Sequence, residues 1–248
     1  MTNRAVHILG KIIEGTFLQP FGVYVYNSII GPKKVKIDVE DTTFKFSILP
    51  ADQGIEDLGG EIDVIREVVK KIDDDDIIWD IGANMGWHAV VFGHWGSIVY
   101  AFEPNPDALN TLIKNSQLNP NSRVLPIMAG LSSETTHNEL ITNINAGKTG
   151  SIEKGEDLFD KRILSQFISG SELLKGMQVP DVLKVDVEGH EMEVIYGFGE
   201  YLKDIEMIAL EEHSGNPIDR EYFRKNGFEL VFEDERGKEK ELIFEAEG

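Results

Sequence analysis

The chain contains no cysteine, so it can form neither a disulfide framework nor a thiolate-based metal or catalytic site. It is also poor in basic residues, because 24 Lys and Arg stand against 44 Asp and Glu, a formal net charge of −20 at pH 7. Nucleic-acid binding depends on cationic side chains that displace counterions from phosphates, so this balance predicts no nucleic-acid partner. The acidity favours a strongly solvated surface, and adaptation to high salt is one hypothesis for it.

The sequence also lacks an uninterrupted apolar run long enough to cross a membrane. Its most apolar N-terminal stretch, Val6 to Leu18, has helical spacing but is interrupted by Lys11 and Glu14. We expect an amphipathic helix that packs on the domain, and peripheral membrane contact through residues 5–18 is the alternative. No signal-peptide pattern is apparent either, so the expected location is the cytoplasm.

The length of 248 residues suits one sizeable α/β domain with an N-terminal extension. We place the extension at residues 1–72 and the main domain at residues 73–248. Within the extension, alternating apolar and polar residues from Lys34 to Leu49 predict a β-hairpin. Apolar residues at helical spacing between Gly60 and Ile72 predict a helix that packs beneath the first strand of the main domain.

From residue 77 onward, predicted strands and helices alternate, which is typical of a mostly parallel, doubly wound sheet. We predict strands at 77–81, 98–103, 123–128, 181–186 and 206–210, helices at 86–94, 106–118 and 219–226, a further helix after residue 191, and a closing antiparallel hairpin at 227–233 and 239–245. The polar stretch from Ser132 to Gly155 is expected to form short antiparallel strands on the surface, either shaping a substrate pocket or as decoration.

A glycine-containing turn, Asp80-Ile-Gly-Ala-Asn-Met-Gly86, follows the first strand of the main domain. The glycines of this D-x-G-x-x-x-G pattern permit a tight turn and close approach of a ligand to the backbone. A carboxylate at the strand end would repel a pyrophosphate, but it suits the ammonium and sulfonium groups of S-adenosylmethionine (SAM). We therefore assign Asp80, Gly82, Ala83, Asn84 and Gly86 to a cofactor site; the alternative is that Asp80 only caps the turn.

A second acid, Glu103, ends the next apolar strand. It follows the first glycine by about twenty residues, which is the spacing of an acid that binds a ribose diol. Pro104 and Asn105 follow it directly, and Met128 ends the third strand, where an adenine would lie, so all four residues join the predicted cofactor site. The alternative for Glu103 is a solvated strand-end acid.

Three motifs in order, DIGANMG from Asp80, AFEPNP from Ala101 and LKVDVEGHE from Leu183, resemble the FkbM-type family of SAM-dependent methyltransferases over roughly residues 77–248. The resemblance implies a Rossmann-like class I methyltransferase fold, SAM as cofactor, and methylation of a hydroxyl on a glycan, a sugar or another small hydroxylated metabolite. The chain departs from the family at Trp87-His88, where a pair of Tyr or Phe is usual, and His190 occupies a position where the family also accepts Ala.

Methyl transfer to a hydroxyl requires a base, and His190 is the candidate because imidazole titrates near neutrality. Asp186 and Glu188 are assigned to the catalytic site with it, as groups that could orient the imidazole. The alternative is a histidine that merely caps or packs at a helix start. A divalent cation bound by these three residues and His213 is possible but not favoured, so no metal ligand is assigned.

Two further acids near this site, Glu191 and Glu211, are expected to face solvent or to make hydrogen bonds. A nucleobase methyltransferase would carry an Asn-Pro-Pro-aromatic run where this chain has Asp186-Val-Glu-Gly189. Two other functions stay open: a non-catalytic Rossmann-like module that binds a nucleotide or sugar nucleotide, and an NAD-dependent oxidoreductase. The sequence leaves the identity of the acceptor and the oligomeric state open.

Overall fold

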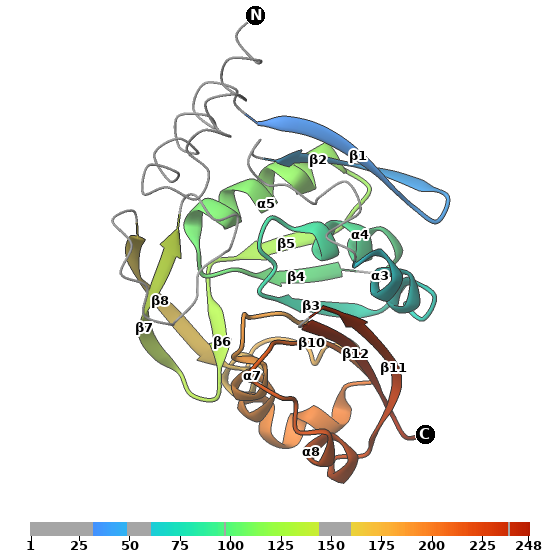
Figure 1. Cartoon of the computed structure of the whole chain (residues 1–248), viewed down its shortest axis with the longest axis vertical. Coiled ribbons are helices and arrows are strands. Elements are labelled where there is room, and N and C mark those ends of the chain that lie inside the picture. Colours follow the sequence, from blue (N-terminus) through green and yellow to red (C-terminus); the bar gives the residue numbers. More distant parts are fainter. Residues whose placement is uncertain (1–31, 49–60, 97, 144–159, 238) are drawn as a thin grey trace, which may run out of the picture.

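The computed structural model describes residues 32–48, 61–96, 98–143, 160–237 and 239–248. The predicted N-terminal helix, with its possible membrane contact at residues 5–18, lies outside this part of the chain. A seven-stranded sheet in the order β11-β12-β10-β9-β3-β4-β5 forms the centre of the molecule (Figure 1). Its strands are β3 (Ile77–Ile81), β4 (Ile98–Phe102), β5 (Val124–Ile127), β9 (Val182–Val185), β10 (Met207–Glu212), β11 (Phe228–Arg236) and β12 (Glu239–Ala246).

Strand directions confirm the predicted sheet. Neighbouring strands from β10 through β9, β3 and β4 to β5 pair in parallel, and β12 pairs antiparallel with both β10 and β11. The chain runs outward from β3 to β5 and later returns to β9 on the other side of β3. This reversal places a topological switch point between the carboxyl ends of β3 and β9, the position where open α/β sheets bind ligands.

Helices cover both faces of the sheet, as a doubly wound fold requires. They are α3 (Ile62–Val69), α4 (Trp87–Trp95), α5 (Pro106–Leu118), α6 (Gly170–Leu173), α7 (Glu191–Phe198), the 3-10 helix η2 (Gly199–Asp204) and α8 (Arg220–Lys225). In Figure 1, α3, α4 and α5 lie on the upper side of the sheet and α7 and α8 on the lower side. The sequence did not predict α6 and η2, because four and six residues are too few for a helical repeat to show.

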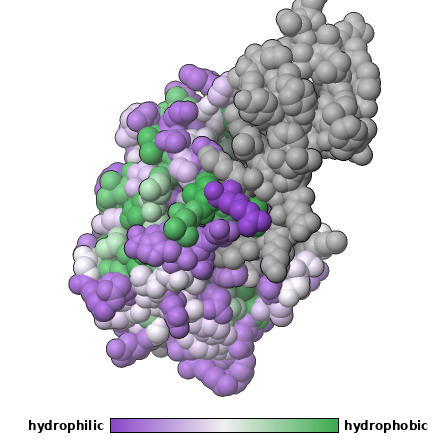
Figure 2. Space-filling model, turned by 90° about the vertical axis from the view of Figure 1, so that its left-hand side faces the viewer, coloured by the Kyte–Doolittle hydropathy of each residue, from purple (hydrophilic) through white to green (hydrophobic). Residues whose placement is uncertain are grey.

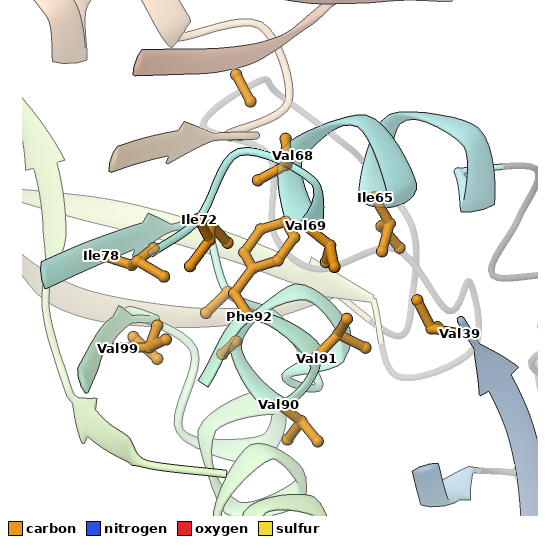
Figure 3. Close-up of a cluster of buried hydrophobic side chains, with 14 of the residues drawn as sticks. Val39, Ile65, Val68, Val69, Ile72, Ile78, Val90, Val91, Phe92 and Val99 are labelled. Atoms are coloured by element: carbon orange, nitrogen blue, oxygen red, sulfur yellow. The ribbon is translucent and has the colours of Figure 1, made fainter. Parts of the chain in front are cut away.

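Phe92 of α4 lies at the centre of the upper core. Figure 3 shows its ring between Ile72 and Val69, with Val68 of α3 close by and Ile78 beyond Ile72. Phe92 is 1% exposed, and burying such a side chain contributes about 1.5–3 kcal/mol. Val68 and Ile72 share this cluster with Ile78 of β3, but the contacts of α3 itself are mainly with α4 and β12, so its packing directly beneath the first strand stays a prediction.

The predicted hairpin is also confirmed. Strands β1 (Lys33–Val39) and β2 (Thr42–Ile48) pair antiparallel across a two-residue turn. Phe46 of β2 is buried and its ring centroid lies 4.3 Å from that of Trp87. The side-chain amide of Asn119, after α5, makes two hydrogen bonds with the backbone of Lys45. Its Nδ2 donates to the carbonyl of Lys45 at 2.7 Å, and its Oδ1 accepts from the amide of Lys45 at 2.9 Å. The hairpin thus shares a core with the main sheet, while the division of the chain at residue 72 stays a prediction.

A separate three-stranded sheet occupies the left of Figure 1. It consists of β6 (Gly130–Ser132), β7 (Thr136–Asn143) and β8 (Asp160–Ser169). The β7–β8 pair is antiparallel, as expected, but β6 pairs with β8 in parallel, and β8 lies beyond the stretch that we predicted. Figure 2 views the molecule from this side, where hydrophobic (green) residues are exposed among hydrophilic (purple) ones.

Candidate active site

Backbone hydrogen bonds fix the turn after β3. The amides of Gly82 and Ala83 both donate to the carbonyl of Phe102, each at 3.0 Å. Gly82 has φ +81°, and a Cβ on it would lie 1.8 Å from the carbonyl oxygen of Asp186. The absence of a side chain at Gly82 therefore serves first to let the ends of β3 and β9 meet, a packing reason that the sequence alone did not indicate.

The remainder of the turn leads into α4. Asn84 and Gly86 have φ +50° and +84°, both in the left-handed region. A Cβ on Gly86 would lie 2.8 Å from Cγ of Leu112, so this glycine lets α4 pack closely on α5. The buried Asn115 donates a hydrogen bond of 2.8 Å to the carbonyl of Met85 and thereby ties the turn to α5.

Glu103 is held by the backbone on both of its oxygens. Oε2 accepts from the amide of Asn84 at 2.9 Å, and Oε1 accepts from the amide of Asn105 at 2.7 Å. The side chain of Asn105 is itself occupied as the N-cap of α5, accepting from the amide of Asp107. Glu103 is 3% exposed, so the alternative of a solvated acid is wrong, and burial raises its pKa to about 7 even though the two backbone hydrogen bonds oppose the shift.

Asp80 lies below the turn, among buried ionisable side chains. It is 1% exposed, and burial raises its pKa, while the charges of His88 and Lys184 work in the opposite direction. A hydrogen bond with the backbone of Ala89 also lowers the pKa, which fits the alternative that Asp80 caps the turn into α4. Its contribution to cofactor binding stays a prediction.

Four ionisable side chains follow one another across adjacent strands at this edge of the sheet: Asp80 on β3, Lys184 on β9, Glu211 on β10 and Glu241 on β12. All four are at most 6% exposed. Burial alone would lower the pKa of Lys184, but the charges of Asp186, Glu241 and Glu211 outweigh it and raise that pKa. Lys184 Nζ lies 3.7 Å from Oδ2 of Asp186, so a buried ammonium stands directly beneath the predicted catalytic acid.

The two departures from the family pattern have structural partners in the N-terminal region. Trp87 packs on Phe46 of the hairpin, and His88 Nε2 lies 3.0 Å from Oε2 of Glu61, the N-cap residue of α3. Burial works to raise the pKa of Glu61, but the hydrogen bond and charge of His88 and the charge of Lys184 lower it to about 2. Trp87 and His88 therefore attach the N-terminal elements to the domain.

A pocket opens beside the ends of β3 and β9, with about 550 Å³ of empty space that includes open solvent. Its lining brings together six of the predicted site residues: Gly82, Glu103 and Pro104 from the cofactor set and Asp186, Glu188 and His190 from the catalytic set. Leu131, Leu140 and Phe167 of the three-stranded sheet form an apolar part of the wall, so the excursion does shape the pocket. The predicted residues Asp80, Ala83, Asn84, Gly86, Asn105 and Met128 lie outside the lining, and Met128 is 65% exposed.

Glu191 organises the loop between β9 and α7. It is 1% exposed, and its Oε1 accepts from the amides of Gly189 and Val187 at 2.9 and 3.3 Å and from Nδ1 of His213 at 3.1 Å. The hydrogen-bonded alternative is thus confirmed for Glu191, and exposure to solvent is wrong. The hydrogen bond with Glu191 raises the pKa of His213 to about 9 against the effect of burial.

Two groups of residues with metal-ligand chemistry share Glu211. One is Asp186, Glu211 and His213, and the other is Glu61, Glu211 and Glu241; within each group the donor atoms lie within 4.8 Å of one another. Oε2 of Glu188 is 3.6 Å from Nε2 of His213. Glu211 is 6% exposed, and burial together with the charge of Asp186 raises its pKa to about 10. Sequence reasoning missed Glu211 and Lys184 as members of the site; a Lys inside the apolar run before Asp186 was the available signal.

Residues 80–230 match the model of the methyltransferase FkbM domain, which covers the turn, both strand-end acids and the loop of Glu191. The chain belongs to the FkbM methyltransferase family. The resemblance seen in the three motifs is thereby confirmed.

Known proteins agree with this assignment. This FkbM family member is 38% identical over 164 residues to the hexuronic acid methyltransferase AglP of Haloferax volcanii. The match covers 65% of this chain and 66% of that protein, so it spans just under two thirds of the relative.

Two solved structures share the fold. One is a methyltransferase FkbM from Methylobacillus flagellatus, with a TM-score of 0.51 and 15% identity, covering 72% of this chain and 46% of that one. The other is a ribosomal protein L11 methylase from Lactobacillus delbrueckii, with a TM-score of 0.50 and 10% identity, covering 76% and 80%. The predicted Rossmann-like class I fold is thereby confirmed. Among the described residues, no helix is long and apolar enough to span a membrane.

Proposed function

We propose that this FkbM family member is a SAM-dependent O-methyltransferase whose acceptor is a hydroxyl of a sugar or glycan. The observation that carries the proposal is that Glu103 and the group Asp186, Glu188 and His190 line one pocket at the switch point between β3 and β9. The similarity to a hexuronic acid methyltransferase supports a glycan acceptor that carries a carboxylate.

In this proposal, SAM occupies the side of the pocket formed by Gly82, Glu103 and Pro104. Glu103 accepts hydrogen bonds from the two ribose hydroxyls. Its orientation is fixed in advance because each of its oxygens already accepts a hydrogen bond from a backbone amide. Ala83, Asn84 and Gly86 shape the turn beneath the cofactor, and Asn105 fixes the start of α5. Met128 follows β5 beside the adenine. Asp80, whose ionised form the charges of His88 and Lys184 favour against the effect of burial on its pKa, attracts the cationic end of SAM.

The acceptor occupies the side formed by Asp186, Glu188 and His190. Its hydroxyl oxygen attacks the methyl carbon in line with the sulfonium, so that the O–C bond forms as the C–S bond breaks. His190 takes the hydroxyl proton, and the products are a methyl ether, S-adenosylhomocysteine and a proton that passes to solvent. Asp186 and Glu188 hold the imidazole and the acceptor in position.

Calorimetry with SAM and NAD, followed by a methyl-transfer assay on uronic-acid oligosaccharides read by mass spectrometry, tests this function. We expect saturable SAM binding, no NAD binding, and a product heavier by one methyl group. Binding of NAD alone would replace the proposal with an oxidoreductase. Binding of SAM without transfer to any hydroxylated acceptor would support a non-catalytic module instead.

A further inference from the structure

The acceptor side of the pocket is acidic. Asp186 and Glu188 line it, and no Lys or Arg among the described residues lines the pocket. A carboxylate on the acceptor would meet repulsion there, and neutral hydroxyls would find acceptors but no charged donor. A cation bound at the site would supply the missing attraction.

Three side chains stand in the right geometry to bind one. The donor atoms of Asp186, Glu211 and His213 lie within 4.8 Å of one another, at the carboxyl ends of the neighbouring strands β9 and β10. Ligands bound at about 2.1–2.4 Å to one cation are separated by about 3 Å when adjacent and by at most about 4.8 Å when opposite. The separations of the three donors are thus compatible with one shared ion, and Asp186 is the member of the trio that lines the pocket.

The orientation of His213 is set from outside this trio. Its Nδ1 donates to Glu191, a residue 1% exposed that also accepts two loop amides. Nε2 is therefore the ring nitrogen left for the ion, and it lies 3.6 Å from Oε2 of Glu188 and 3.9 Å from Oε2 of Glu211, too far from either for a hydrogen bond. At metal sites, a ligating histidine usually donates a hydrogen bond from one ring nitrogen to a carboxylate and binds the metal through the other ring nitrogen.

Lys184 gives a second, independent indication. Its side chain is 1% exposed, its ammonium makes no hydrogen bond among the described residues, and Oδ2 of Asp186 lies 3.7 Å away, within ion-pair range but beyond hydrogen-bond range. Buried polar groups are nearly always hydrogen-bonded, so this ammonium points to oxygen atoms of a ligand sphere beside Asp186. Its charge also attracts Oδ2 of Asp186.

We propose that Asp186, Glu211 and His213 bind a divalent cation, and that this cation holds the acceptor through two of its oxygens, either a carboxylate with a neighbouring hydroxyl or a pair of neighbouring hydroxyls. The cation lowers the pKa of the bound hydroxyl, so that His190 removes its proton more easily. The role in methyl transfer rests on the proposed function, whereas binding of the cation does not.

Manganese binding, followed by the EPR signal of free Mn²⁺ and by calorimetry, tests the site directly. A protein of net charge −20 attracts cations diffusely, so the titration belongs in about 1 M KCl, where the Debye length is about 3 Å. We expect one saturable Mn²⁺ per chain in the wild-type protein. Absence of a saturable site under these conditions would overturn the proposal without reference to any variant.

Variants locate the ion. Glu211→Gln and His213→Gln should each weaken Mn²⁺ binding by at least about 10-fold. Glu191→Gln, which alters the hydrogen bond to His213 as well as those to two loop amides, should weaken it by about 10–100-fold. The matched control is Glu229→Gln, which removes one exposed carboxylate from β11 and should change nothing. Unchanged binding in both Glu211→Gln and His213→Gln would place the ion elsewhere and contradict the assignment.

SAM affinity, measured in the same samples, separates this proposal from the function on which its catalytic role rests. Retained SAM binding shows that a variant is folded. Stoichiometric Mn²⁺ binding without methyl transfer would support the metal site and contradict the proposed function. Methyl transfer that EDTA does not change, in a protein that binds no Mn²⁺, would support the proposed function and contradict the metal site.

Discussion

On the cofactor side of the pocket the backbone positions the functional groups, whereas on the acceptor side charged side chains position one another. Glu103 is fixed by the amides of Asn84 and Asn105. His213 is instead fixed by Glu191, and Asp186 lies against Lys184. The cofactor side is formed by one βαβ unit, β3-α4-β4. The acceptor side requires the pairing of β9 with β10, two strands from the C-terminal part of the chain. We therefore expect substitutions on the two sides to affect different properties of the protein.

The largest expected effect arises where the two sides meet. In Gly82→Ala the new Cβ would lie 1.8 Å from the carbonyl oxygen of Asp186, so the ends of β3 and β9 must separate. We expect a loss of at least about 4 kcal/mol in the free energy of unfolding, measured by urea denaturation. The control is Gly227→Ala, at nearly the same φ of +84° but with no atom within 4 Å of the Cβ, which should cost only about 1–2 kcal/mol. Equal costs would show that the contact does not join the two sides.

His190→Ala tests the acceptor side alone. We expect turnover to fall by about 10²–10⁴ with SAM affinity unchanged, because a general base acts only in the transition state. Steady-state kinetics with a methylated-product readout, together with calorimetry, gives both quantities. His137→Ala, which removes an exposed histidine from β7, is the control and should retain full activity. A fully active His190→Ala enzyme would exclude His190 as the base.

The cofactor side should show its own dependence on pH. Burial raises the pKa of Glu103 from 4.5 to about 7, so below pH 7 the free protein carries a neutral carboxyl there. The ribose hydroxyls need the carboxylate as acceptor, so SAM binding must then release a proton. We expect SAM affinity to be flat above pH 8 and to fall by up to about tenfold per pH unit below pH 7. In Glu103→Gln, which carries no proton to release, the same calorimetric titration should show no such slope.

The smallest expected effect concerns the whole surface. Raising KCl from 0.1 M to 1 M shortens the Debye length from about 10 Å to about 3 Å and screens the self-repulsion of a chain with net charge −20. The melting temperature should rise over this range. A flat or falling curve would make the acidity an ordinary solubility feature and end the high-salt hypothesis.

The cofactor side could be predicted from the sequence because its signals are local. The turn with Gly82 and the strand-end acid Glu103 belong to one strand–helix–strand unit, so their spacing alone brings them together. The same holds for the hairpin formed by β1 and β2, whose two-residue turn and alternating pattern are contiguous in sequence.

The acceptor side could be predicted only in part. Asp186, Glu188 and His190 follow one strand, so their grouping was visible, but Lys184 lies in an apolar run that reads as an ordinary buried strand. Its partners Glu211 and Glu241 reach it only through the order β12-β10-β9, which no local pattern encodes. The parallel pairing of β6 with β8 was missed for the same reason.

SAM affinity in three proteins, measured by calorimetry at pH 8, tests the separation of the two sides most directly. Relative to wild type, Glu103→Ala should weaken binding by about 1–3 kcal/mol, the cost of losing a charged hydrogen-bond partner of the ribose diol, and Glu211→Gln should leave it unchanged. Unchanged affinity in Glu103→Ala, or an equal loss in Glu211→Gln, would contradict the assignment of Glu103 to the cofactor and of Glu211 to the acceptor side.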